Sequence, residues 1–171
     1  LKELQAEGQI DTLVLSQHNI GKLNALWRIG QLAMGEVIAY TDDDVYHMPG
    51  WLPAHLALLD GFPNVGAVTG FYIKQRVNMS SDATLAWAKE LEARQPHAVE
   101  RGQLIPRKWE EEYMDNSGRS EERYQSEIAG LEDIVVEQNG LKAWVSAHHF
   151  QVMLPKKVLL ETLSEMLEDG W

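Results

Sequence analysis

Short apolar runs alternate with a longer stretch of helical periodicity near the start of the chain. Leu13-Val14-Leu15 follows polar residues and predicts a buried strand over residues 12–16. Apolar residues then recur at helical spacing and predict a helix over residues 22–34, which Gly35 ends. Val37–Tyr40 predicts a second buried strand. The order strand, helix, strand predicts a βαβ unit, and therefore parallel strands in an α/β sheet.

The remaining pattern predicts a fold of the α/β class, with a mostly parallel sheet flanked by helices. A helix over residues 51–59 and a strand over residues 65–70 come next, followed by a helix that ends near Arg94. Residues 95–126 are polar without clear periodicity, which is typical of an irregular or poorly ordered excursion. Apolar runs on both sides of Asn139-Gly140 predict a C-terminal hairpin, and a last helix is expected from about Pro155 to Leu167.

Composition narrows the classes of protein that fit. The 171 residues suit one domain spanning 1–171, and 44% of them are hydrophobic. A net charge of −11 argues against nucleic acid or anionic membrane as a partner. The absence of cysteine excludes disulfides and fits a reducing, cytoplasmic location, and no stretch is long enough to span a membrane. Because the chain starts at Leu1 without a methionine and stops at Trp171, we interpret both ends as fragment boundaries.

Three consecutive aspartates, Asp42, Asp43 and Asp44, follow the predicted strand at Val37–Tyr40 directly. Ligands of open α/β sheets bind beyond the carboxyl ends of strands. Because side chains alternate along a strand, Asp42 and Asp44 can point the same way, and a divalent cation would relieve their repulsion. The alternative is a solvated acidic turn. The preceding apolar strand and the following turn at Pro49-Gly50 favour the cation site.

An ordered set of motifs surrounds these aspartates. The stretch HNIGKLNALWRIGQLAMGEVIAYTDDDVYHMPGWL resembles the core of the family-2 glycosyltransferases, which have the GT-A fold. PNVGAVTG at residues 63–70 is similar to the strand that follows in that family, so the resemblance covers roughly residues 12–74. The matching positions, in order, are Asn19, Gly21, Asn24, Ala33, Gly35, Glu36, Asp42, Asp44, Pro49, Trp51 and Leu52.

The resemblance implies an enzyme of polysaccharide biosynthesis that transfers a hexosyl or related group. The donor would be a nucleotide-diphosphate sugar, and the acceptor a hydroxyl of a carbohydrate or lipid-linked molecule, with inversion at the anomeric carbon. Asp42 and Asp44 would hold Mn²⁺ or Mg²⁺, while Asp42 and Asp43 would also contact the ribose or the donor sugar. The loop that carries Asn19, Gly21 and Lys22 would face the nucleotide, although Lys22 is as readily a solvated residue at a helix start.

The catalytic base has three candidate positions. Asp133, in the pair Glu132-Asp133, is one candidate. However, FQVMLPKKVLLETL at residues 150–163 resembles the strand and helix that precede the family's Glu-Asp pair, which favours a base beyond Trp171. Glu168-Asp169 is a third pair, poorly placed at a helix end.

His148 or His149 offers a late metal ligand, although an ordinary strand histidine is the favoured interpretation.

Three other classes of protein fit parts of the sequence. A catalytically incomplete or degenerate sugar-nucleotide-binding module stays open, because the family's base-binding strand would lie before Leu1. A phosphatase of the haloacid dehalogenase type would use the first aspartate as a nucleophile, but its motif normally follows the first strand. A Rossmann dehydrogenase is excluded, since no Gly-x-Gly-x-x-Gly follows any predicted strand.

Overall fold

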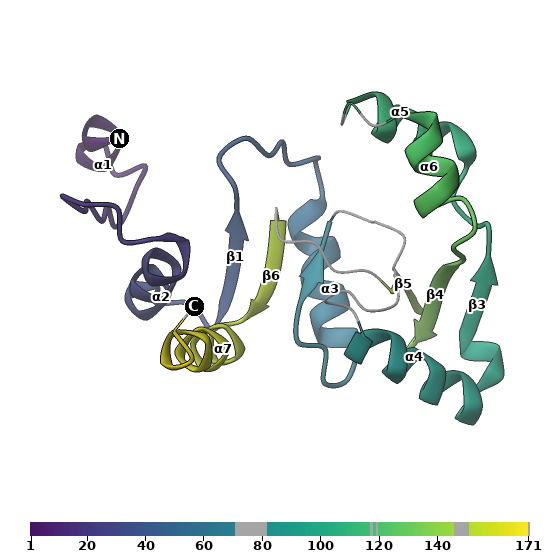
Figure 1. The fold of residues 1–171 in the computed structure, drawn as a ribbon. Helices are drawn as coiled ribbons and strands as arrows, with labels where there is room; N and C mark the ends of the chain where they lie inside the picture. The colour runs from purple at the N-terminus through teal and green to yellow at the C-terminus, as the bar shows by residue number, and fades with distance from the viewer. Residues whose placement is uncertain (71–81, 117, 119, 146–150, 171) are drawn as a thin grey trace. The chain divides into compact units, whose positions relative to one another are not determined.

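The computed structural model describes residues 1–70, 82–116, 118, 120–145 and 151–170. The chain divides into two compact units. Unit 1 comprises Leu1–Ala39 and Met153–Trp171, and unit 2 comprises Tyr40–Val152. Figure 1 shows their helices and strands. Each unit is described by itself, and the single domain expected over residues 1–171 stays a prediction.

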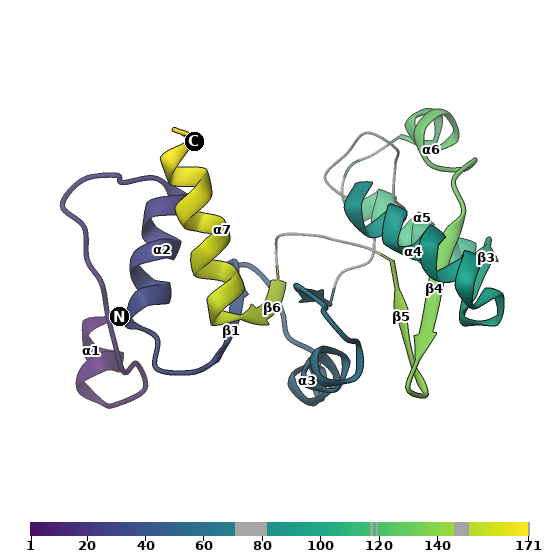
Figure 2. The same cartoon turned by 90° about the horizontal axis from the view of Figure 1, so that it is seen from below.

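Unit 1 is built on two helices from opposite ends of the sequence. Helix α2 (Lys22–Leu32) packs against α7 (Lys156–Glu168), and Figure 2 shows the pair side by side. They pack tightly at Gly30, where an added Cβ would lie 3.2 Å from the Leu160 side chain and 3.3 Å from that of Leu159. A short helix, α1 (Lys2–Ala6), lies at the N-terminus. Both long helices agree with the periodicity of the sequence.

Lys156 joins α7 to the end of α2. Its backbone N–H donates to the carbonyl of Glu36 at 2.8 Å, and its Nζ donates to the carbonyl of Ala33 at 2.5 Å. Nζ also lies 3.4 Å from the carbonyl oxygen of Gln31. A cation at the carboxyl end of a helix is favourable, because the terminal carbonyl groups carry partial negative charge. Lys156 therefore holds the two helices of unit 1 in register.

The strand expected over residues 12–16 is absent, so the prediction of a βαβ unit is wrong. This segment has no regular structure, and Leu15 is 62% exposed. An isolated extended segment is not stable in water, because its backbone groups need a neighbouring strand as a partner. The apolar run Leu13-Val14-Leu15 predicts extended backbone, but it does not encode which strand, if any, pairs with it.

The described residues form two sheets, and the expected parallel sheet is not found among the described pairings. β1 (Val37–Thr41), β6 (Gln151–Pro155) and β2 (Val68–Thr69) form one sheet in the order β1-β6-β2. β3 (Val99–Gly102), β4 (Asp133–Gln138) and β5 (Leu141–Trp144) form the other, and both of its pairings are antiparallel. The α/β class is confirmed, whereas the predicted strand at residues 65–70 shortens to β2.

The hydrophobic core of unit 2 lies between a helix and the second sheet. Helix α4 (Asp82–Arg94) contributes Ala88 and Leu91, which are 0% and 2% exposed. They pack with Phe62 after α3 (Trp51–Gly61) and with buried residues of β4. The remaining buried members of this core are Ala98, Ile134, Val136 and Val145. Consecutive buried residues in β4 explain its continuous apolar run, which is typical of a strand covered on both faces.

The Asn139-Gly140 hairpin is confirmed. β4 and β5 pair from Gln138 opposite Leu141, and the two turn residues have positive φ values of 52° and 75°. This combination is the turn that matches the twist of antiparallel strands. Asn139 Nδ2 also donates to the carbonyl of Gly61 at 2.7 Å, which ties the hairpin tip to the end of α3.

Residues 95–126 are largely regular, so the prediction of an irregular excursion is wrong. They contain the short 3₁₀ helix η1 (Pro96–Ala98), strand β3 and helix α5 (Arg107–Asn116), and they run into α6 (Glu121–Glu127). Arg107 bridges the two α-helices: its Nη2 lies 2.8 Å from Glu121 Oε2, and its guanidinium carbon lies 3.7 Å from the centre of the Tyr124 ring. Contacts of this kind join residues far apart in sequence and leave no periodic pattern.

An ion pair on the surface of unit 2 gives its stability a dependence on pH. Arg101 Nη2 lies 2.8 Å from Glu92 Oε2, and this hydrogen-bonded guanidinium lowers the pKa of the Glu92 carboxyl below its ordinary value of 4.5. Because the pKa is lower in the folded state, the stabilisation is complete above pH 4.5 and is lost as pH falls through the folded-state value.

We expect the urea midpoint to fall between pH 5 and pH 3, and to fall less steeply in Glu92→Gln, which keeps the side chain but cannot ionise. The effect is small because the pair is solvent-screened. Urea titrations at several pH values measure it, with Glu90→Gln as the matched control on the same helix. Identical slopes in wild type and Glu92→Gln would contradict a contribution from this pair.

Candidate functional site

The aspartate cluster lies directly after β1, at the carboxyl end of that strand, as the sequence predicts. Asp42 is half-buried, and its Oδ1 accepts a hydrogen bond from the Tyr40 hydroxyl, since residues two apart share a side of an extended chain. Asp43 and Asp44 are exposed on a turn. Because β1 ends at Thr41, the alternation expected of a strand does not extend to Asp44, whose direction is set by the turn.

A stack of three rings follows the cluster. The ring centroids of His47 and Trp51 are 4.4 Å apart, and those of Trp51 and His55 are 5.5 Å apart with an edge-to-face geometry. His55 Nδ1 lies 2.7 Å from the carbonyl oxygen of Trp51, so Nδ1 carries the hydrogen that is donated. The stack fixes the segment between the aspartates and α3. Sequence reasoning missed it, although the spacing i, i+4, i+8 was a signal for it.

His55 also lies beside Gly70 and Gln151. A Cβ added to Gly70 would lie 2.5 Å from Gln151 Oε1 and 3.1 Å from His55 Nε2. His55 is 6% exposed and Gln151 is 9% exposed. Their Nε2 atoms are buried and have no hydrogen-bond partner within the described part of the chain. Position 70 therefore needs a residue without a side chain, because a polar pair already fills that space.

The tight space at Gly70 gives a stability prediction with a built-in control. We expect Gly70→Ala to lower the free energy of unfolding by about 1–3 kcal/mol, the usual cost of overpacking a filled site. Gly66→Ala is the matched control, because an added Cβ there meets no atom within 4 Å, and its effect should stay within about 0.5 kcal/mol. Urea denaturation measures both; equal effects of the two substitutions would contradict the crowding at Gly70.

The three residues expected on the nucleotide side lie in unit 1. Asn19 Oδ1 accepts a hydrogen bond from the Gly21 N–H at 2.9 Å, which closes a small turn before α2. Gly21 has φ +77° and caps the helix, and Lys22 is its exposed first residue. Asp42, Asp43 and Asp44 belong to unit 2. The turn at Asn19 thus presents polar groups at the start of α2, a position that suits an anionic ligand.

Asp133 is placed in the interior. The residue is 0% exposed, and its Oδ2 accepts hydrogen bonds from the N–H groups of Leu104 at 2.8 Å and Ile105 at 2.9 Å. This carboxylate fixes the segment between β3 and α5 against β4. A general base must reach the hydroxyl that it deprotonates, and a fully buried side chain has no such access in this structure. Its neighbour Glu132 is exposed.

The chemistry of the aspartates fits a hard divalent cation, because carboxylate oxygens are its preferred ligands and both Asp43 and Asp44 are exposed. Within residues 1–70, 82–116, 118, 120–145 and 151–170, no group of three or more His, Cys, Asp or Glu is arranged to hold a metal ion. His148 and His149 lie outside the described residues.

Comparison with known protein families identifies a family for this chain. Residues 1–100 match the model of the family described as glycosyl transferase family 2. No curated protein and no solved structure matches the chain. The matched segment includes the turn at Asn19, strand β1, the aspartate cluster and the ring stack. In the part of the chain that the structure describes, no helix combines the length and the apolar character needed to cross a membrane.

Proposed function

The chain belongs to glycosyl transferase family 2, and from this premise we propose that it transfers a hexosyl or related group from a nucleotide-diphosphate sugar to a hydroxyl acceptor. Membership of the family implies a nucleotide-sugar donor and an acceptor. The observation that supports the proposal best is the aspartate cluster, which directly follows a strand inside the matched segment. We further propose a cytoplasmic location and a role in polysaccharide biosynthesis.

The aspartates are proposed to form the donor site. Asp44 and Asp42 would hold Mn²⁺ or Mg²⁺, and a bound cation of this kind offsets negative charge on a diphosphate. Asp43 and Asp42 would contact the ribose or the donor sugar. The hydrogen bond from Tyr40 supports this assignment, because it holds the Asp42 carboxylate in one orientation. The His47–Trp51 contact supports it too, since it restrains the far end of the loop.

Asn19, Gly21 and Lys22 are proposed to face the nucleotide. The hydrogen bond from the Gly21 N–H to Asn19 fixes the turn, and the start of α2 carries N–H groups that suit an anion. Lys22 adds a positive charge at that helix start.

A carboxylate base would deprotonate the acceptor hydroxyl, with displacement and inversion at the anomeric carbon. Asp133 is the candidate within the chain, and its burial favours the alternative of a base beyond Trp171.

The test is release of nucleoside diphosphate by the full-length protein, measured with a panel of nucleotide sugars and with Mn²⁺, Mg²⁺ or EDTA. We expect release that depends on one nucleotide sugar and is abolished by EDTA. Binding of a nucleotide sugar without any release or transfer would favour the degenerate binding module instead. Absence of both binding and release across the panel would overturn the proposed function.

A further inference from the structure

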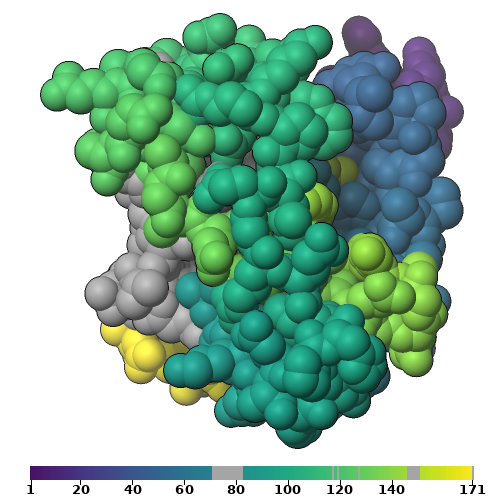
Figure 3. All heavy atoms as spheres, turned by 90° about the vertical axis from the view of Figure 1, so that its right-hand side faces the viewer, coloured from purple at the N-terminus to yellow at the C-terminus, as the bar shows by residue number. Residues whose placement is uncertain are grey.

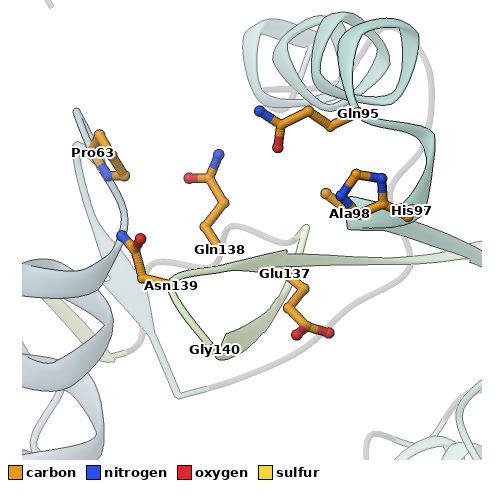
Figure 4. A pocket seen from close by; sticks show the side chains of 8 residues that line it. All are labelled: Pro63, Gln95, His97, Ala98, Glu137, Gln138, Asn139 and Gly140. Carbon is orange, nitrogen blue, oxygen red and sulfur yellow. The ribbon is translucent and has the colours of Figure 1, made fainter.

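A polar depression lies on unit 2, between the end of α4 and the tip of the β4–β5 hairpin. Figure 3 shows the α4–η1 region in teal next to the yellow-green hairpin, and Figure 4 shows the depression itself. Its volume is about 410 Å³, within the range of about 300–1,000 Å³ typical of small-molecule sites. Five of its lining residues have polar side chains: Gln95, His97, Glu137, Gln138 and Asn139.

Hydrogen bonds to backbone carbonyl groups hold the segments that form the walls of the depression. The Gln95 N–H donates to the carbonyl of Leu91 at 2.7 Å, and the Ala98 N–H donates to the carbonyl of Gln95 at 2.9 Å. On the other side, the hairpin turn is held to Gly61 by the 2.7 Å bond from Asn139. The site is therefore formed before a ligand arrives, which lowers the entropic cost of binding.

The polar groups of the depression suit hydroxyl groups. Figure 4 shows the amides of Gln95 and Gln138 reaching into the same space, while the Glu137 carboxylate turns away from them. An amide offers both donors and acceptors, as a sugar hydroxyl requires.

Other ligand classes fit the depression less well. Its lining includes neither lysine nor arginine, which disfavours a phosphate or a carboxylate. Its polar walls disfavour a lipid chain, because burying these amides against hydrocarbon would leave them unpaired. A neutral polyhydroxylated molecule is the class that remains.

Helix α3 relates this depression to the aspartates within unit 2. The segment that carries Asp42–Asp44 leads into the start of α3, and Pro63 of the depression follows its end. A helix of 11 residues is about 16 Å long at 1.5 Å per residue. A ligand in the depression is thus held at the opposite end of α3 from that segment.

We propose that the depression binds a neutral sugar residue of an extended acceptor glycan, remote from the hydroxyl that reacts. The proposal rests on the proposed function only in calling this glycan the acceptor. Contacts to remote parts of a substrate contribute binding energy that positions the reacting part.

The test uses ¹⁵N-labelled protein titrated with cellotetraose, maltotetraose and chitotetraose, with inorganic phosphate as the charged probe. We expect at least one tetrasaccharide to shift the side-chain amide signals of Gln95 and Gln138 and the backbone signal of Gly140. Gln95→Ala should weaken that binding about fivefold, the usual worth of one hydrogen bond. Gln31→Ala is the matched control, an exposed helical glutamine of unit 1, and should leave the affinity unchanged.

Gln138→Ala is the second variant, and its folding is checked by the dispersion of the amide spectrum. Shifts that are the same in wild type, Gln95→Ala and Gln138→Ala would overturn the site, as would binding of phosphate alone or no binding of any tetrasaccharide. Nucleoside diphosphate release by the full-length protein is measured separately. Nucleoside diphosphate release without tetrasaccharide binding would overturn the proposed glycan site and leave the proposed transferase function standing. Tetrasaccharide binding without release would overturn the transferase function and leave the glycan site standing.

Discussion

Asp44→Ala in the full-length protein is expected to abolish metal-dependent binding of a nucleoside diphosphate, with a loss of at least about 100-fold in affinity. Altering the groups that merely orient a metal ligand already costs about 10–100-fold, and Asp44 is proposed as a ligand itself. Its carboxylate is exposed on the turn after β1, so the substitution leaves no buried group unpaired. Asp42→Ala should weaken binding, and Asp43→Ala should act mainly on contacts to the donor.

Calorimetric titration of UDP and GDP with and without Mn²⁺ makes this measurement. Asp60→Ala is the matched control, because Asp60 is also exposed and lies near the end of α3. Unchanged metal-dependent binding in Asp44→Ala would refute the proposed site. Binding that is lost equally in Asp60→Ala would indicate a general effect of lowered negative charge.

Asp133→Ala is expected to lower the free energy of unfolding by about 2–6 kcal/mol. The substitution leaves the N–H groups of Leu104 and Ile105, which are part-buried, without the acceptor they share, and an orphaned buried donor costs about 1–3 kcal/mol. That loss is a large part of the total stability of a typical domain, which is about 5–15 kcal/mol. Asp133→Asn keeps an acceptor oxygen and should retain most of the stability.

Urea denaturation followed by circular dichroism measures these differences, and Glu132→Ala, at the exposed neighbour, is the control. The Asn variant also separates structure from catalysis. If the full-length Asp133→Asn protein is folded and transfers sugar, the base lies elsewhere. A folded Asn variant without transfer would instead make Asp133 the base, and a stable Ala variant would contradict the buried anchor.

Elements that depend only on local backbone geometry could be predicted from the sequence. Asn139 and Gly140 tolerate positive φ, and the hairpin forms at these positions. The spacing of Leu23, Leu26 and Trp27 predicted α2, because a helix needs only its own backbone for hydrogen bonds and a single apolar stripe for packing. The aspartates follow β1 as expected, since the apolar run before them is a local signal for a strand.

Features that depend on contacts with distant parts of the chain could not be predicted from the sequence. Leu13-Val14-Leu15 has the composition of a strand, but strand pairing depends on a neighbour that the segment itself does not specify. Arg107 of α5 meets Glu121 and Tyr124 of α6, a contact that no local pattern records. Asp133 was one candidate for the base in the sequence, and its hydrogen bonds to the N–H groups of Leu104 and Ile105 depend on a segment far away in the chain.

The sequence by itself determined the family, the α/β class and the position of the aspartate cluster, because ordered short motifs and apolar runs are local properties of the chain. Only the tertiary structure decided which strands pair. Only it placed the side chains of His55 and Gln151 against Gly70, where a side chain would not fit. It alone brought Gln95 and Gln138 to one depression. The physical reason is that these features depend on contacts between residues far apart along the chain, whose pairing no local pattern records.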